Sequence, residues 1–390
     1  MFRPRISRLV NVEELRLAAR RRVPRFAFDF IDGGAGDGSG MAHNRAVLDG
    51  MRLVPRYLRD VSRIETQTVL FGKTWTRPYG IAPTGVANLM WPGADLALAK
   101  LAHQRGFPYV ASTPCSTSIE DLAKVCPDLW FQLYVTRDEA VTRDLIERAH
   151  AAGAKALVVT VDTPVPGRRD RNLRNRLVLP LRLPLRGWLE IASHPGWSLA
   201  TLAAGAPRLA NLERYAPKGT PKAALSLFGS QLLAVSTTWT HLESVRKHWS
   251  GPLIVKGVLD VDDALGCQAL GCDGVLLSNH GGRQLEAAVS PFEVLQAMRE
   301  RLGAGLTILA DSGVRHGSDV VKALGLGADL VLMGRLGLYG MGAGGPLGVA
   351  HAFDLLDAEL TNTLAQLGAT SPTVVQAGTH DGHWLRPGPL

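Results

Sequence analysis

The chain has 390 residues, of which 46% are hydrophobic and 20% are charged, and this composition excludes a mainly disordered protein. Its net charge of +8 suits an anionic membrane, a nucleic acid or an acidic substrate, so the positions of the arginines must decide between them. The four cysteines include no CxxC pair, which argues against a disulfide framework and a structural zinc site.

Targeting signals are not evident in the sequence. No run of 18 apolar residues is free of charge and proline, so a membrane-spanning helix is not expected. The arginine-rich start, Met1–Arg8, lacks the apolar core of a secretory signal. We therefore expect a cytoplasmic protein, either free or attached peripherally to the inner face of the cell membrane.

Two helices are predicted before the main fold. Asn11, followed by two glutamates, has the pattern of a helix cap with an acidic first turn. Phe26–Ile31 reads as a helix that stops at the glycines after Asp32. We expect this segment to cover the main fold, and we expect the tail after Gly368 to be loosely ordered.

Eight short apolar, β-branched runs predict buried strands. They are Tyr79–Thr84, Phe107–Thr113, Trp130–Val135, Ala156–Asp162, Leu253–Val258, Gly274–Asn279, Thr307–Ser312 and Leu330–Arg335. Helical patterns follow most of them. They are Ala94–Arg105, Ser118–Val125, Asp138–Ala152, His241–Trp249, Val261–Leu270, Pro291–Leu302, Ser318–Leu326 and Pro346–Leu367.

This alternation predicts an α/β protein, a closed TIM (β/α)8 barrel over about residues 79–368 with an N-terminal helical cover, in a single domain of residues 1–390. The alternative is an open doubly wound sheet. Such a sheet would usually carry a GxGxxG turn after an early strand, and none is present there.

One connection of the predicted barrel is unusually long. The fourth and fifth strands start 97 residues apart, at Ala156 and Leu253, which indicates an insertion at about residues 164–238. Within it, Leu177–Tyr215 is rich in Leu, Ala and Pro, and it contains Trp188 and Trp197 with more arginines than glutamates. This pattern is typical of a segment that lies among anionic lipid headgroups. The alternative is an active-site lid or a subunit contact.

Polar residues stand at the carboxyl ends of the predicted strands, where a (β/α) barrel places its active site. They are Thr84, Ser112, Gln132, Tyr134, Thr160, Asp162, Lys256, Ser278 and Asp311, and glycines stand at two of the same strand ends, Gly85 and Gly334. A buried polar group without a partner is costly, so this set predicts a polar ligand across the barrel mouth.

The last two strand ends have the pattern of a phosphate site. Asp311, Gly313 and Arg315 lead into the helix after the seventh strand, and Gly334 with Arg335 follows the eighth. Barrels commonly bind phosphate at this corner, although ordinary glycine turns with surface arginines are the alternative. Together with the lysine, glutamine and threonine at neighbouring strand ends, the pattern predicts bound FMN, with the lysine stabilising negative charge on the flavin ring.

His280 is the candidate catalytic base. It follows a strand directly, Arg283 lies three residues further on, and Asp162 at another strand end could accept its second ring proton. No metal site is expected, since no HxH, HExxH or Cys/His spacing converges here. A different class of function also fits: a non-redox barrel acting on a sugar phosphate, with His280 and Lys256 as acid/base or Schiff-base groups.

The run SNHGGRQL (Ser278–Leu285) resembles the active-site signature of the FMN-dependent α-hydroxy acid dehydrogenase and oxidase family. The resemblance covers about residues 10–370. Its other motifs are Pro83–Gly85, Phe131–Tyr134, Thr160–Arg169, Val255–Gly257, Ala310–Ala328 and Met333–Arg335.

The resemblance implies a role for each matching residue. His280 is the base, oriented by Asp162; Arg169 and Arg283 bind the substrate carboxylate, and Tyr134 bonds the substrate or its developing oxyanion. The implied flavin contacts are Thr84, Gly85, Ser112, Gln132, Thr160, Lys256 and Ser278. The implied phosphate or ribityl contacts are Asp311, Gly313, Arg315, Gly334 and Arg335. Whether the base removes the Cα proton or the hydroxyl proton is left open.

The resemblance also bears on substrate, acceptor and assembly. Members that oxidise small acids carry bulky residues where this chain has Pro114 and Pro166, which implies an aromatic (S)-2-hydroxy acid such as (S)-mandelate or a substituted mandelate. Phe30 replaces a family tyrosine that helps to hold the carboxylate.

Gly85 stands where oxidases tend to have alanine, which implies a quinone-type acceptor. A homotetramer without nucleic acid is expected, and an L-lactate dehydrogenase or an oxygen-using oxidase remains the alternative.

Overall fold

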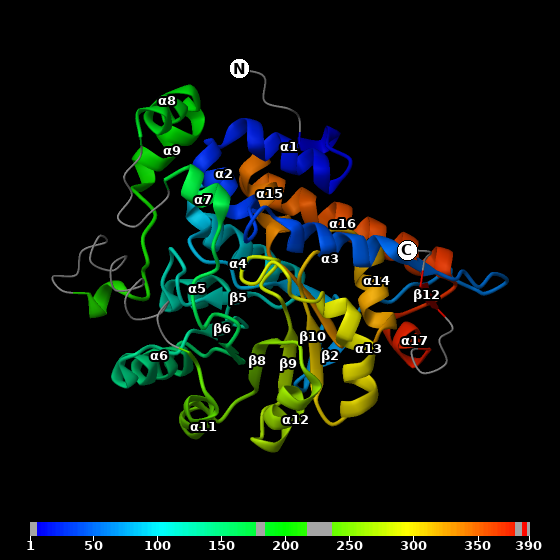
Figure 1. The fold of residues 1–390 in the computed structure, drawn as a ribbon. Helices are drawn as coiled ribbons and strands as arrows, with labels where there is room; N and C mark the ends of the chain where they lie inside the picture. The colour runs from blue at the N-terminus through cyan, green and yellow to red at the C-terminus, as the bar shows by residue number, and fades with distance from the viewer. Residues whose placement is uncertain (1–5, 177–183, 217–235, 379–383, 388–390) are drawn as a thin grey trace.

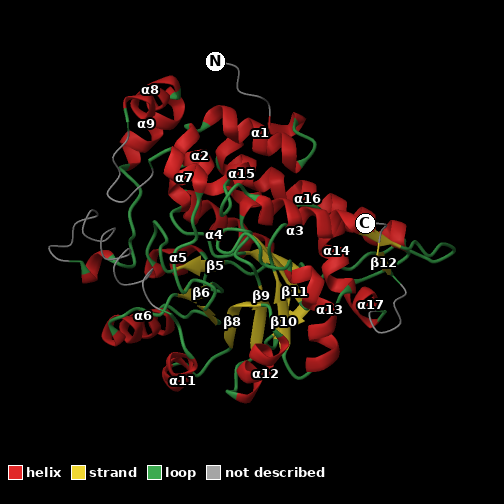
Figure 2. Ribbon diagram, in the orientation of Figure 1, coloured by secondary structure: helices red, strands yellow, loops and turns green. Residues whose placement is uncertain are grey.

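The computed structural model describes residues 6–176, 184–216, 236–378 and 384–387, and its centre is a near-closed barrel of eight parallel strands (Figures 1 and 2). The strands are β4 (Tyr79–Ile81), β5 (Val110–Ser112), β6 (Trp130–Leu133), β7 (Leu157–Thr160), β8 (Leu253–Val258), β9 (Gly274–Leu277), β10 (Thr307–Ala310) and β11 (Leu330–Met333). Their order around the sheet is β4-β11-β10-β9-β8-β7-β6-β5, and a parallel bridge between Ile81 and Tyr109 joins the two end strands. The predicted barrel is confirmed, and the doubly wound alternative is wrong.

All eight helices predicted around the barrel are present. They are α4 (Ala94–Arg105), α5 (Ile119–Val125), α6 (Glu139–Ala151), α11 (Trp239–His248), α12 (Val261–Ala269), α13 (Pro291–Leu302), α14 (Gly317–Gly325) and α16 (Pro346–Leu367). Local chemistry sets their starts. At α13, Ser290 and Glu293 form a capping box and proline takes the first helical position, where its missing N–H is not needed.

Side chains of the strands alternate between the barrel interior and the surrounding helices, because a strand has a period of two. Trp130, Val158 and Ile254 belong to an apolar cluster inside the barrel, whereas Phe131 and Val159 belong to the larger core beneath the helices. A hairpin of β2 (Thr68–Leu70) and β3 (Lys73–Trp75) closes the apolar end of the interior. In most of the strands, the interior position two residues further toward the carboxyl end is polar: Gln132 follows Trp130, and Lys256 follows Ile254.

A helical cover lies over that polar end (Figure 1). It contains α1 (Val12–Arg22), α2 (Arg25–Asp32) and α15 (Arg335–Gly344), and α1 packs against α15 and α16. Asn11 caps α1 by accepting a hydrogen bond from Glu14 N at 2.8 Å, and α2 ends at Gly33. Both predicted N-terminal helices are thus confirmed. The cover also includes α3 (Ser39–Gly50), which the sequence did not predict.

The expectation of a loosely ordered tail is wrong for most of the residues described there. Pro372–Ala377 form helix α17, whose N-cap Ser371 accepts a hydrogen bond from Val374 N. Leu385–Pro387 form β12, which pairs antiparallel with β1 (Met51–Leu53), and the adjacent Trp384 is buried. Burial of an aromatic side chain stabilises this tail although no periodic pattern announces it.

The insertion after β7 contributes α7 (Asp170–Arg174), α8 (Leu185–Ser193) and α9 (Pro195–Ala204); 177–183 and 217–235, which include part of the predicted membrane segment, lie outside the described residues. Helices α8 and α9 stand away from the barrel at the upper left of Figure 1. Trp197, expected among headgroups, is instead buried: its Nε1 donates to Leu89 O at 3.2 Å and its ring packs edge-on against Phe26. Among the described helices, none is long and apolar enough to cross a bilayer.

Candidate active site

Polar side chains gather at the carboxyl ends of the barrel strands in two hydrogen-bonded groups. Ser112 Oγ donates to Gln132 Oε1 at 2.8 Å, and Lys256 Nζ donates to Ser278 Oγ at 2.7 Å and lies 3.5 Å from Asp311 Oδ2. All five side chains are buried. The strand register brings them together, because each follows an interior apolar residue by two positions and the strands are parallel.

Two polar atoms at these strand ends have no partner. Gln132 Nε2 and Thr160 Oγ1 are buried and, within the described part of the chain, neither has a hydrogen bond. An unpaired buried polar group costs about 1–3 kcal/mol, so these atoms indicate a polar ligand. A flavin ring edge offers carbonyl oxygens and ring nitrogens for them and negative charge for Lys256. The residues present therefore fit FMN.

The remaining flavin candidates lie where β4 and β11 adjoin. Thr84 and Gly85 follow β4, and a Cβ placed on Gly334 would lie 3.3 Å from Thr84 Cγ2. A side chain at position 334 would therefore press against Thr84.

The predicted phosphate corner has a tight backbone. Gly313 has φ +97°, and Gly334 is the N-cap of α15, so backbone N–H groups of a helix start are available to an anion. Arg315 is half-buried, 3.9 Å from a carboxylate oxygen of Glu13.

Arg335, the first residue of α15, donates to main-chain oxygens. Its Nε, Nη1 and Nη2 donate to Ile31 O, Gly281 O and Gly33 O at 3.1, 3.0 and 3.0 Å. The side chain therefore joins the end of α2 to the loop after β9. A contact between this guanidinium and phosphate stays a prediction.

His280 and Asp162 form the predicted pair. His280 Nδ1 lies 2.9 Å from Asp162 Oδ1, and the backbone N of His280 donates to Ser278 Oγ at 3.0 Å. His280 has φ +58°, a conformation that few residues with side chains adopt and that marks functional sites. Burial acts to raise the pKa of Asp162, but His280 and Lys256 outweigh it, so the carboxylate is ionised. The pair leaves Nε2 of the imidazole for substrate.

The protonation state of His280 predicts how kcat/KM depends on pH. Burial lowers its pKa below 6.5 and Lys256 adds to this, against the opposing effect of Asp162. A base must be neutral to accept a proton, so kcat/KM should rise with pH through this lowered pKa and be level at neutral pH. Asp162→Asn removes the influence that raises the pKa, so its rise should lie at still lower pH. Measurement of kcat/KM between about pH 5 and 8 checks this, and a rise centred above 6.5 in the wild type would contradict it.

Arg283 is held by the end of helix α2. Its Nη1 donates to Gly33 O at 2.6 Å and Ile31 O at 3.2 Å, its Nη2 donates to Phe30 O at 2.8 Å, and its guanidinium lies 5.6 Å from the centre of the Phe30 ring. Burial and then the charge of Arg169 lower the pKa of Arg283. Carbonyls at a helix C-terminus carry partial negative charge, which stabilises a buried cation in place.

Arg169 and Tyr134 complete the group around the base. Arg169 Nε donates to Arg283 O at 3.4 Å, and burial lowers the pKa of Arg169. Burial and then the carboxylate of Asp162 raise the pKa of Tyr134, while both arginines act to lower it. The phenol is therefore protonated at neutral pH. A base, two cations and a hydroxyl donor, all half-buried, thus lie close together, which suits an anionic substrate with a removable proton.

Sequence reasoning missed several residues that hold this site. Asn44 and Asn279 exchange side-chain hydrogen bonds at 2.9 and 2.7 Å, and Ser312 Oγ accepts from Gly281 N at 3.0 Å. Gln284 Nε2 donates to the main-chain oxygens of Asp162 and Val165 at 3.1 Å, tying the base loop to the loop after β7. Gln284 stands inside the SNHGGRQL motif, and this position could have indicated its role in the site. Asn44 lies far away in the sequence, and no sequence pattern indicates that it belongs to the site.

Comparisons with known proteins agree with this geometry. Residues 19–380 match the model of the family described as FMN-dependent dehydrogenase. The chain is 43% identical to (S)-mandelate dehydrogenase of Pseudomonas putida over 94% of this chain and 92% of that protein, and 40% identical to an L-lactate dehydrogenase of Caulobacter sp. (strain K31) over 93% and 95%.

Solved structures give the same result. A crystal structure of the monotopic membrane protein (S)-mandelate dehydrogenase matches with a TM-score of 0.91 and 42% identity over 97% of this chain and 99% of that chain. A mandelate oxidase with (S)-2-phenylpropionate matches with a TM-score of 0.81 and 32% identity over 98% and 99%. The chain therefore belongs to the FMN-dependent dehydrogenase family and is an FMN-dependent oxidoreductase of the 2-hydroxy acid group.

Proposed function

We propose that this protein oxidises an aromatic (S)-2-hydroxy acid, (S)-mandelate or a substituted mandelate, to the 2-oxo acid and passes the electrons to a quinone-type acceptor. The observation that carries the proposal is the pairing of His280 with Asp162 beside two half-buried arginines and Tyr134. Membership of an FMN-dependent family removes the non-redox alternative. The homotetramer implied by the resemblance stays a prediction.

Each residue of the group has a task in this reaction. Arg169 and Arg283 bind the carboxylate and so orient the substrate, and Tyr134 donates a hydrogen bond to its hydroxyl oxygen. His280 takes a proton from the substrate, at Cα or at the hydroxyl, and Asp162 stabilises the imidazolium that results. When bound, FMN supplies the acceptor for the two electrons that the substrate loses.

Of the two positions expected to make room for an aromatic substrate, Pro114 supports the preference. Pro114 is buried beside Gly85, where the family resemblance places bulky residues in members that use small acids. Phe30 has no hydroxyl, so it stabilises Arg283 through its ring and its main-chain oxygen alone. Pro166, the other residue expected to make room, is exposed and adds no support.

The test is anaerobic bleaching of the bound flavin by a panel of 2-hydroxy acids. (S)-Mandelate should bleach it fastest, (R)-mandelate should not, and L-lactate and glycolate should be slow. Equal or faster bleaching by L-lactate would make the protein a lactate dehydrogenase. Failure of every hydroxy acid in the panel would contradict the site assignment itself.

The acceptor gives a further prediction. A Cβ on Gly85 would lie 2.8 Å from Pro114 Cγ, so Gly85→Ala must displace this loop and change the space beside the flavin. We expect the reduced wild type to react slowly with oxygen and rapidly with a quinone analogue, and Gly85→Ala to react faster with oxygen. Stopped-flow mixing of reduced enzyme with oxygenated buffer measures both rates. A wild type that reacts as fast with oxygen as with the quinone is an oxidase.

We also propose that α8 and α9 attach the protein to a membrane surface. Leu185, Trp188 and Leu189 on α8 are 75, 61 and 61% exposed, and Leu199 and Leu202 on α9 are 67 and 81% exposed. Such an exposed apolar group is unusual for a free surface and typical of an interfacial helix. The 42%-identical (S)-mandelate dehydrogenase is described as a monotopic membrane protein. An active-site lid or a subunit contact is the alternative.

Point substitutions distinguish these possibilities. Trp188→Ser with Leu189→Ser should move the protein from the membrane fraction to the supernatant, while flavin reduction by substrate survives. Leu58→Ser with Val69→Ser, at exposed positions outside the insertion, is the matched control and should not move it. If both double variants partition alike, the segment is a lid or a contact instead. Deletion of the centre of residues 177–215 should act in the same direction as the first variant.

A further inference from the structure

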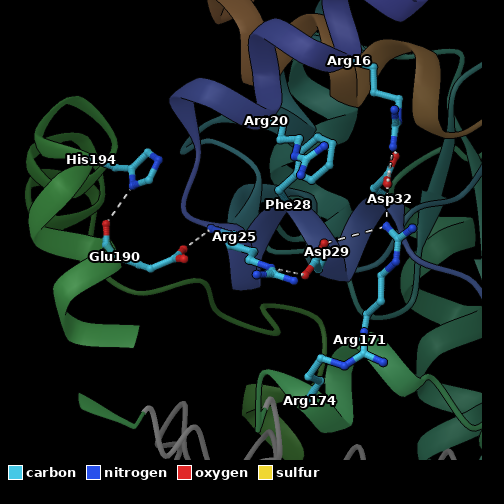
Figure 3. Close-up of a pocket in the computed structure, with 10 residues that line it drawn as sticks. All are labelled: Arg16, Arg20, Arg25, Phe28, Asp29, Asp32, Arg171, Arg174, Glu190 and His194. Carbon is cyan, nitrogen blue, oxygen red and sulfur yellow. Dashed lines mark hydrogen bonds and ion pairs between the residues drawn. The ribbon is translucent and has the colours of Figure 1, made fainter. Parts of the chain in front are cut away.

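A pocket of about 360 Å³ lies outside the catalytic group, between the helical cover and the insertion (Figure 3). Five arginines line it: Arg16 and Arg20 stand one turn apart on α1, Arg25 begins α2, and Arg171 and Arg174 stand one turn apart on α7. Its volume falls within the range of small-molecule sites. Three separate helices thus direct cations toward one space.

Carboxylates neutralise only part of this charge. Asp32 accepts from Arg16 at 2.6 and 2.9 Å and from Arg171 at 2.7 Å, and Asp29 accepts from Arg25 at 3.4 Å.

The third carboxylate of the pocket, Glu190, accepts from the backbone N of Arg25 at 2.6 Å. The lining thus has five guanidinium groups and three carboxylates, and Glu13, outside the lining, also pairs with Arg16 at 2.7 Å. Arg20 and Arg174 are exposed, and no hydrogen bond or ion pair joins either of them to another described residue. These two side chains are the ones available to an anion.

The pocket is separate from the substrate group. Asp32, the last residue of α2, points its carboxylate toward Arg16 and Arg171, whereas the main-chain oxygens of the neighbouring residues accept from Arg283. The end of α2 thus stands between the two arginine groups, and an anion in the pocket would not occupy the place of the substrate carboxylate.

The place of the pocket beside helix α8 indicates which kind of molecule carries the anion. Leu185, Trp188 and Leu189 share one face of α8 by their spacing, and Glu190, which lines the pocket, lies on the opposite side of the helix. An interfacial helix buries its apolar face about 5–10 Å into the boundary between headgroups and acyl chains. Its opposite side then lies at the level of the lipid phosphates.

We propose that this pocket binds the phosphate group of an anionic phospholipid headgroup. Arginine is suited to this task because its planar fork donates two parallel hydrogen bonds to phosphate oxygens. Arg20 on α1 and Arg174 on α7 supply these donors, whereas Arg16, Arg25 and Arg171 are paired with carboxylates and hold the lining in place. The inference rests on the proposed membrane contact and is independent of the proposed substrate.

Vesicle binding tests the proposal with the full FMN-loaded protein. The wild type is titrated with phosphatidylcholine vesicles, with and without phosphatidylglycerol. Arg20→Gln with Arg174→Gln should lose about 30-fold in affinity for the anionic vesicles, from about 1 kcal/mol per arginine at the surface, and nothing for the neutral ones. Arg143→Gln with Arg301→Gln, which removes two exposed arginines from α6 and α13, is the control and should keep the preference. An unchanged melting temperature of each variant shows that it folds.

The other outcomes overturn the proposal in distinguishable ways. If the control double variant loses as much affinity for anionic vesicles as the Arg20/Arg174 double variant, the loss reflects the net charge of the protein. The pocket is then not a binding site. A second outcome is that inorganic phosphate raises the melting temperature of the wild type but not of the Arg20/Arg174 variant, while both bind anionic vesicles equally well. The pocket would then bind free phosphate, and the proposal of a lipid headgroup would be wrong. Trp188→Ser with Leu189→Ser weakens binding to neutral vesicles if the membrane contact exists, so failure of that contact is seen separately.

Discussion

Replacing His280 with asparagine should slow reduction of the bound flavin by (S)-mandelate on the order of 10⁴-fold, the upper range for loss of a general base, while FMN stays bound. Asparagine is the substitution of choice because it tolerates positive φ, here +58°, better than alanine does. The hydrogen bond from the backbone N of this residue to Ser278 Oγ can then remain. Stopped-flow absorbance gives the rate, and the flavin spectrum gives the occupancy.

The control is a histidine outside the site. His248→Asn, at an exposed position on α11, should leave the reduction rate unchanged. If His280→Asn reduces its flavin within about tenfold of the wild-type rate, another group is the base and the assignment fails. His280→Ala should be as slow as the asparagine variant and should also melt at a lower temperature, since alanine is strained at this backbone position.

Replacing Arg169 with methionine should lower kcat/KM for (S)-mandelate by about 30-fold to several thousand-fold. The estimate is the cost of leaving one partner of a buried ion pair alone, about 2–5 kcal/mol, at 1.4 kcal/mol for each factor of ten. Arg169 is a cleaner probe than Arg283, because its side chain makes one long hydrogen bond, to Arg283 O at 3.4 Å. Arg283 makes three hydrogen bonds to α2, so Arg283→Met should also lower the melting temperature.

A neutral substrate analogue separates a carboxylate contact from a general disturbance of the site. The methyl ester of mandelate has no charge for Arg169 to bind, so wild type and Arg169→Met should oxidise it at similar low rates. A variant that is impaired as strongly with the ester as with the acid would show that Arg169 acts on something else. Arg143→Met, on the exposed face of α6, should leave both substrates unaffected.

The barrel and most of its mouth could be predicted because their information is local. A strand in a barrel alternates strictly, so an apolar Trp130 followed two residues later by Gln132, or Ile254 followed by Lys256, indicates both a buried strand and a polar end. The pairing of His280 with Asp162 follows from the same rule, since both stand just beyond strand ends that converge.

What could not be predicted depends on contacts between distant segments. The sequence of α15, RLGLYGMGAG, has four glycines and reads as a loop, because glycine is a poor helix former. In the structure these glycines permit close packing: a Cβ on Gly342 would lie 2.8 Å from both Ala19 Cβ and Met90 Sδ. Likewise, no local pattern shows that Arg283 and Arg335 share the carbonyls at the end of α2. Tertiary packing decides such features.

The contacts at the end of α2 have a consequence for biosynthesis. Ile31 O accepts from Arg335 Nε, and Asp32 Oδ1 accepts from Tyr339 Oη at 2.8 Å, so partners in these two contacts are more than 300 residues apart. A growing chain emerges from the ribosome at about 5–20 residues per second. The end of α2, which accepts hydrogen bonds from Arg283, therefore waits for at least about 15 s after its own synthesis before Arg335 and Tyr339 exist. Catalytic competence is among the last properties that this chain acquires.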